Sequence, residues 1–197
     1  MTKAKARKII TECASLYNKN LCDKELIFVY LTNSGPDSIS VIYRKKNYKH
    51  LTGIVSKHLP EKFFNSCYLK TISENEISFN KNGTTTLKLE ILECIMNIAH
   101  QVKFLGDYLN SNIYLEVDKI VGNTSIGLGV EKGEHLYYPK SVLKGDMRKQ
   151  IRNMIPVSAV LEKQLNKPNS NYSCVHFKNN LSPEQKQTLL EFIDNMS

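Results

Sequence analysis

Residues 86–98 constrain the fold of this chain more than any other segment. Their apolar side chains cover most of the circumference of a helix, and only Lys88, Glu90 and Glu93 are left outside. A helix that is apolar on nearly all sides must be covered by other elements on nearly all sides. The segment therefore predicts a central core helix whose interior positions include Leu89, Leu92, Ile95 and Met96.

Local patterns predict the elements around this helix. Apolar residues at helical spacing behind a capping Thr2 predict an N-terminal helix over residues 1–20, and Pro60 begins a short helix to about Ile72. An apolar run at 26–31, turn formers at 33–37 and a second run at 39–43 predict a β-hairpin. Ser182 precedes Pro183 and begins a closing helix over 182–197.

The second half of the chain is predicted to consist mostly of strands. They are expected at 113–117, 125–130, 135–138, 157–161 and 173–177, with residues 131–134 as a hairpin turn, and one helix is expected over 141–153. Strands and helices do not alternate regularly, which favours an α+β fold. We expect an antiparallel sheet with packed helices, in a single domain over residues 1–197.

Charge and cysteine content limit the classes of function. A net charge of +8 attracts polyanions such as nucleic acid, anionic membrane or acidic protein, and RNA is the partner we expect. No apolar run approaches the roughly 18 residues that cross a bilayer, so no membrane contact is expected. The five cysteines lack zinc-like spacing to histidines, which predicts reduced thiols, no metal site and a cytoplasmic location; no cofactor is expected.

The densest basic cluster, residues 44–50, ends in His50. Lysines, a tyrosine and an imidazole together can hold a phosphate by charge and a base by stacking. A histidine titrates near neutrality, so His50 can move a proton at a reacting oxygen, and Thr52 and Gly53 follow directly. The alternative interpretation of the cluster is a solvated strand end.

A second constellation repeats every four residues along the helix expected over 141–153. Cations so placed can neutralise phosphates or a pentacovalent phosphorane, although a solvated helix face is the alternative. The row consists of Lys140, Lys144, Arg148 and Arg152, beside the apolar residues Leu143, Met147 and Ile151.

Two further segments carry polar residues with two interpretations each. Thr84 and Thr85 directly precede the core helix, where they can either cap it or bind a phosphate. Lys119 and Asn123 lie in residues 118–123, which are expected to join two strands; Asn123 can either form the turn or donate hydrogen bonds to a substrate.

Taken in order, these motifs resemble the fourth phage-associated family of barnase–EndoU–colicin–RelE-like (BECR-fold) nucleases over residues 43–161. The motifs are His50-Leu51-Thr52-Gly53-Ile54, Asn82-Gly83-Thr84-Thr85 with Lys88-Leu89, Asp118-Lys119 with Gly122-Asn123, and Pro139 before Leu143-Lys144-x-Asp146-x-Arg148. The resemblance implies an RNase-type α+β fold and carriage by phages or other mobile elements. The matched positions that it implicates are His50, Thr52, Thr84, Thr85, Lys119, Asn123, Lys144 and Arg148.

Three functions compete on this basis. The first is a metal-independent RNA endonuclease in which His50 transfers a proton, Lys144 and Arg148 stabilise the phosphorane, and the other matched residues bind substrate on one shared concave surface. The second is an inactive phage protein that binds and inhibits a host defence or nucleic-acid enzyme. The third is a DNA-binding accessory protein. The matched motifs contain one histidine only, so the second proton-transfer group is unidentified, with Asp118 as one candidate.

Overall fold

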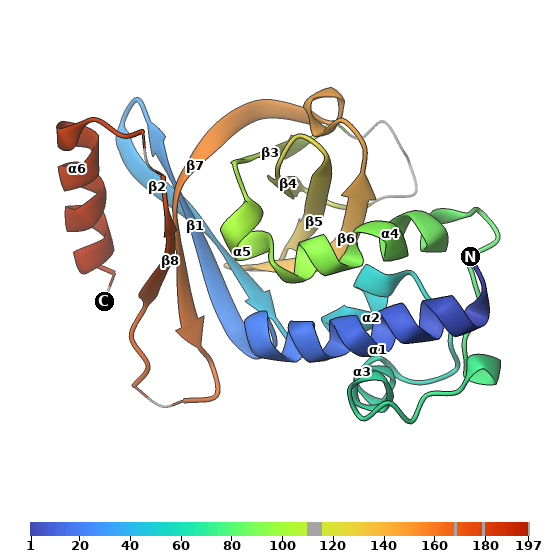
Figure 1. Ribbon diagram of the computed structural model, residues 1–197. Coiled ribbons are helices and arrows are strands. Elements are labelled where there is room, and N and C mark those ends of the chain that lie inside the picture. Colours follow the sequence, from blue (N-terminus) through green and yellow to red (C-terminus); the bar gives the residue numbers. More distant parts are fainter. Residues whose placement is uncertain (110–115, 168, 179, 197) are drawn as a thin grey trace.

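The computed structural model describes residues 1–109, 116–167, 169–178 and 180–196, and within them the chain is an α+β protein built on a closed β-barrel (Figure 1). Seven strands follow one another in the order β1-β2-β6-β5-β4-β3-β7, β1 pairs back to β7, and β8 extends the sheet from β7. The strands are β1 (Lys24–Thr32), β2 (Gly35–Tyr43), β3 (Phe104–Tyr108), β4 (Lys119–Gly122), β5 (Ile126–Lys132), β6 (Tyr137–Lys144), β7 (Ile151–Gln164) and β8 (Ser173–Phe177).

The closed barrel corrects the expected plain antiparallel sheet. The α+β class is confirmed, but β2 and β6 meet in parallel, at Val41 and Tyr137, so the sheet is mixed. Closure depends on the length of β7, whose first half pairs with β3 and whose second half pairs with β1 and β8. Figure 1 shows this strand curving over the molecule. Closing a sheet on itself leaves fewer unpaired edges than an open sheet would.

The N-terminal helices cover one side of the barrel. They are α1 (Lys3–Asn20), α2 (Asn47–Thr52), α3 (Pro60–Tyr68), α4 (Thr84–Met96) and α5 (Ile98–Gln101). Amphipathic patterns predict three of them, whereas the short helices at 47–52 and 98–101 have no counterpart among the expected elements. The Thr2 hydroxyl caps α1 by accepting a hydrogen bond from the Lys5 amide at 3.2 Å. Helix α3 ends four residues before the expected Ile72, and the chain leaves it through Lys70 in the left-handed region.

Helix α4 is the central core helix that its apolar pattern predicts. It packs against α1 on one side and against β5 and β6 on the other, and the four expected interior residues, Leu89, Leu92, Ile95 and Met96, are all buried. Leu87, on the remaining side, is 52% exposed. The position of α4 between helices and barrel explains why most of its circumference is apolar.

The closing helix α6 (Pro183–Asp194) begins where Ser182 predicts. Ser182 and Gln185 form a reciprocal capping box at its start. Leu189 packs with residues of β1 and β7 in a second apolar cluster, on the other side of these strands from the main core. Figure 1 shows α6 separated from the other helices by the strands. No helix in the described ranges is long and apolar enough to cross a membrane.

The prediction of a helix over 141–153 is wrong. Residues up to Lys144 belong to β6, a 3-10 turn spans Met147–Lys149, and β7 begins at Ile151. The apolar row that suggested a helix still gathers in one place, because Leu143, Met147 and Ile151 pack together in a third apolar cluster. Gly145 has φ +130° and lies in the connection between β6 and this turn. A chain reversal thus brings together side chains that a helix would also have aligned.

Two expectations about the strands also need correction. Residues 118–123 do not merely join strands, because Lys119–Gly122 is itself β4, and β3 was not expected. The expected strand at 113–117 lies mostly outside the described residues. The strands at 125–130, 157–161 and 173–177 correspond to parts of β5, β7 and β8, and β6 begins at Tyr137, near the end of the strand expected at 135–138.

Candidate functional site

The short helix α2 carries His50 and is anchored from its other side. Tyr48 and Leu51 are fully buried in the main core, whereas His50 is exposed. At the start of the helix, the Asn47 side-chain oxygen accepts a hydrogen bond from the Arg44 amide at 2.8 Å. The amphipathic pattern of α2 therefore fixes which face of the helix, and so which histidine, is presented to solvent.

The family motif that contains His50 is, structurally, a helix C-cap. Gly53 has φ 65° and ends α2 in the left-handed region, which favours glycine. The Thr52 hydroxyl donates to the Lys49 carbonyl at 2.8 Å, and the Lys88 ammonium group on α4 donates to the His50 carbonyl at 3.1 Å. Carbonyls in the last turn of a helix lack intrahelical partners, and these two groups supply them.

Thr52 and Thr85, both predicted to bind substrate, are completely buried. The Thr85 hydroxyl accepts from the Asn80 amide at 2.9 Å and donates to the Gly53 carbonyl at 2.7 Å. It does not cap its own helix, because the N-cap residue of α4 is Gly83, with no side-chain cap hydrogen bond. In this structure the two threonines form hydrogen bonds within the chain next to His50, and neither side chain is accessible to solvent.

His50 lines a hollow of about 320 Å³ between α2 and the β5–β6 hairpin. On β6, Lys140 is the extra residue of a β-bulge, since Gly129 faces Ser141 and Val130 faces Pro139. Bulges re-aim a side chain, and the Lys140 ammonium group lies 2.8 Å from the Glu131 carboxylate. The residues that line the hollow are Lys46, Asn47, His50, Glu131, Tyr138, Pro139 and Lys140.

The electrostatic surroundings of His50 favour a neutral imidazole. Partial burial lowers the pKa of His50 below its ordinary value of 6.5, and the positive charges of Lys140, Lys88 and Lys49 lower it further, while Glu131 opposes them. A histidine with a lowered pKa is unprotonated at neutral pH. His50 can therefore accept a proton from a bound hydroxyl group, and the surrounding lysines can offset the charge of a phosphate.

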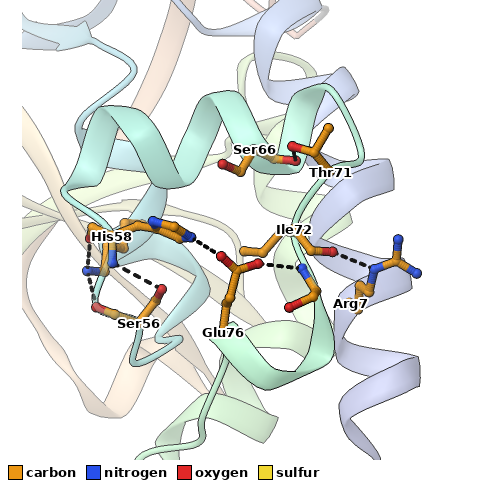
Figure 2. A network of polar contacts seen from close by, with 9 residues as sticks. Arg7, Ser56, His58, Ser66, Thr71, Ile72 and Glu76 are labelled. Atoms are coloured by element: carbon orange, nitrogen blue, oxygen red, sulfur yellow. Dashed lines mark hydrogen bonds and ion pairs between the residues drawn. The ribbon is translucent and has the colours of Figure 1, made fainter.

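The chain that follows α2 is held by a polar network that reaches α1 (Figure 2). The Lys49 ammonium group donates to the carbonyls of Ser56 and His58, at 2.8 and 2.6 Å. As Figure 2 shows, the His58 ring meets Glu76 at 2.7 Å, and the Arg7 guanidinium donates to the Ile72 carbonyl at 2.7 Å. These contacts fix the segment that follows α2 near its beginning, at Ser56 and His58, and near its end, at Ile72 and Glu76.

Lys144 and Arg148 line a different hollow, of about 340 Å³, together with Ser125 and Asp146. The Lys144 ammonium group lies 2.6 Å from the Glu90 carboxylate on α4. The Arg148 guanidinium forms two hydrogen bonds with Asp146, at 2.8 and 3.0 Å. The structure thus gives both cations a carboxylate partner, and no interaction within the described ranges joins either of them to His50.

The remaining predicted site residues also have partners within the chain. The Lys119 ammonium group lies 2.6 Å from the Asp107 carboxylate. The Asn123 side-chain oxygen accepts from the amides of Ser125 and Ile126, at 3.0 and 3.2 Å, which confirms the turn interpretation. The Thr84 hydroxyl donates to the Asn82 side chain at 2.7 Å.

Sequence reasoning missed the role of Glu131 and Tyr138 in the hollow and had assigned them only to a hairpin. No local pattern points to them, because they meet His50 only through the packing of α2 on β6. Glu131 is the carboxylate that shares the hollow with His50.

Asp118, the candidate weighed for proton transfer, accepts a hydrogen bond from the Lys132 amide at 2.6 Å. No group of three or more His, Cys, Asp or Glu residues in the described part of the chain could hold a metal ion.

Comparison with known protein families matches most of the chain to a family model. The family described as phage-Barnase-EndoU-ColicinE5/D-RelE like nuclease 4 matches residues 9–182, a wider range than the motifs at 43–161. No curated protein and no solved structure matches the chain significantly.

Proposed function

Since this chain belongs to the fourth family of phage-Barnase-EndoU-ColicinE5/D-RelE like nucleases, we propose that it is an RNA endonuclease that needs no metal ion. The proposal includes carriage by a phage or another mobile element and action in the cytoplasm of a bacterial host. The observation that carries it is the hollow at His50, where an imidazole with a lowered pKa lies among lysines contributed by α2 and β6.

The proposed reaction uses the 2′-hydroxyl of RNA as its nucleophile. Neutral His50 takes the proton of this hydroxyl, whose oxygen forms a bond to the adjacent phosphorus while the bond from phosphorus to the 5′ oxygen breaks. The departing 5′ oxygen takes a proton from the Lys140 ammonium group, which lines the same hollow. Lys140 and Lys46 offset the charge that builds up on the phosphorane. DNA lacks the 2′-hydroxyl and is not a substrate for this route.

Lys144 and Arg148 are proposed to contribute from the second hollow, which they line with Ser125 and Asp146. A nucleic-acid strand carries a phosphate at every nucleotide, so a protein can hold several phosphates at once. The two cations would bind a phosphate beside the cleaved one after exchanging their carboxylate partners for it. Lys119 and Asn123 remain proposed substrate contacts, while Thr52, Thr84 and Thr85 are proposed to act by shaping the segments around His50.

The test is cleavage of a defined RNA in the presence of a strong chelator. The wild type is expected to cut RNA, but not DNA or 2′-O-methyl RNA of the same sequence. His50→Ala should lose at least about 100-fold in turnover, the usual contribution of a general base. His100→Ala, an exposed histidine on α5, is the control and should retain full activity. Binding of RNA without any cleavage would contradict the proposal and favour the inhibitory phage protein.

A further inference from the structure

Lys88 is the cation of α4 that faces α2, the helix that carries His50. Its side chain is partly buried, and in the described part of the chain its ammonium group forms no ion pair. The hydrogen bond to the His50 carbonyl, at 3.1 Å, is the polar contact that the structure gives it. Burial lowers the pKa of Lys88. Within the described residues, the Lys88 ammonium group is thus paired with a helix carbonyl near the protein surface rather than with a carboxylate.

The methylene chain of Lys88 packs closely against Gly53, and its ammonium group contacts His50. A Cβ atom on Gly53 would lie 2.8 Å from Cδ of Lys88, closer than real contacts allow. The positive φ of Gly53 also disfavours any other residue there. Glycine at position 53 thus serves two purposes, because it ends α2 and leaves room for the lysine to pass.

The contact between Lys88 and α2 has a clear physical basis. Carbonyls in the last turn of a helix carry partial negative charge and lack backbone partners, so a cation placed there is stabilised. Helix α2 has only six residues, and an isolated helix of this length is not stable. Its orientation, and with it the direction of the His50 side chain, must therefore come from tertiary contacts such as that of Lys88.

We propose that Lys88 is a positioning residue for His50, holding the end of α2 against α4 so that the imidazole faces the hollow between Lys46 and Lys140. The catalytic meaning of this inference rests on the proposed function, but the positioning itself does not. It also explains why Thr52, Gly53, Thr85 and Lys88 occur among the matched family motifs. Together they form one group of contacts that fixes the end of α2 next to the histidine, rather than a set of separate substrate contacts.

The test is a titration of the His50 ring followed by nuclear magnetic resonance, without RNA. Lys88→Met keeps the length and packing of the stem but removes the charge and the donor. The pKa of His50 should rise in this variant, because a positive neighbour is lost, and the His50 ring resonance should change position. Lys144→Met is the matched control, since Lys144 is paired with Glu90, and it should leave the titration of His50 unchanged. Lys88→Arg should restore most of the wild-type titration.

Turnover of RNA provides the second measurement. Lys88→Met should lower kcat by about 10- to 100-fold with little change in KM, as expected when a reacting group is slightly misplaced. Thr85→Val breaks the link to the Gly53 carbonyl without changing any charge, and it should also lower kcat, whereas Thr85→Ser should not. This second pair keeps the test informative if Lys88→Met does not fold.

The outcomes separate the two proposals. An unchanged pKa of His50 in a folded Lys88→Met variant, or full turnover in both Lys88→Met and Thr85→Val, would overturn the positioning role. A wild type that never cleaves RNA, but whose His50 ring resonance shifts in the charge-neutral Thr85→Val variant as well as in Lys88→Met, would overturn the proposed function and leave the positioning role standing.

Discussion

The Lys144 ammonium group lies 2.6 Å from the Glu90 carboxylate and joins the end of β6 to helix α4. Both side chains are substantially exposed, at 46% and 40%, so the pair contributes little to stability. Its importance is electrostatic, because it neutralises a cation that the sequence motifs assign to phosphate stabilisation. Hydrogen bonding and the charge of Lys144 lower the pKa of Glu90, which keeps the carboxylate ionised at neutral pH.

Glu90→Gln should therefore strengthen RNA binding, because it releases the Lys144 charge for a phosphate. Lys144→Ala should weaken binding and reduce the slope of log affinity against log salt by about 0.7, the value for one phosphate contact on a single strand. Binding of non-cleavable 2′-O-methyl RNA at several salt concentrations measures both effects. Glu184→Gln, which removes an equal charge on α6, is the control. Equal affinities for the Glu90 and Glu184 variants would contradict the assignment of Lys144 to RNA binding.

The rate of RNA cleavage should depend on pH through His50. A general base must be unprotonated, and the pKa of His50 lies below 6.5. The rate should therefore rise with pH up to this pKa and level off above it, so that activity is complete at neutral pH. His50→Ala should lose this limb of the profile while binding RNA nearly as tightly as the wild type. A wild-type rate that falls as pH increases from about 5 to 7 would instead make His50 the general acid.

Replacement of Leu92 by Ala should destabilise the protein by roughly 2–5 kcal/mol, the usual cost of a cavity at a core leucine. Leu92 is fully buried on α4. Leu87→Ala on the same helix makes the same chemical change at a largely exposed position and should alter the free energy of unfolding by less than about 0.5 kcal/mol. Denaturant unfolding measures both. Similar losses for the two variants would mean that α4 is not oriented as described.

The five cysteines should react with a thiol reagent in two groups. Cys94 and Cys174 are exposed and should react in the folded protein. Cys13, Cys22 and Cys67 are buried, and burial raises the pKa of each thiol to about 12, so they should react only on unfolding. Mass spectrometry of the unfolded, unreduced chain should find all five labelled. A chain that reproducibly lacks two labels would reveal a disulfide.

Local patterns were sufficient for α1, the β1–β2 hairpin, α4 and α6. Each of these elements has its own cap, turn or apolar periodicity within a short stretch of sequence, as with Thr2 and Ser182. Such signals act between near neighbours, so they are visible without knowledge of the fold. The burial of Leu92 followed from the same kind of evidence, because apolar residues around a whole helix require cover on most sides.

The segment over 141–153 shows where local pattern fails. Leu143, Met147 and Ile151 at four-residue spacing fit a helix, yet they converge through a strand, a turn and a second strand. Pairing of β6 with β5 and of β7 with β3 supplies hydrogen bonds that the same residues would otherwise make within a helix. The partner strands lie elsewhere in the chain, so periodicity within the segment does not report them.

The sequence by itself determined that His50 is a candidate for proton transfer, because the imidazole is the side chain that titrates near neutrality and it lies in a basic cluster of a matched motif. Only the tertiary structure decided its neighbours. The packing of α2 on β6 and α4 places Lys140, Glu131 and Lys88 around it and leaves Lys144 in another hollow. The pKa of His50 depends on its burial and on its distances to other charges, and both exist only once the chain has folded.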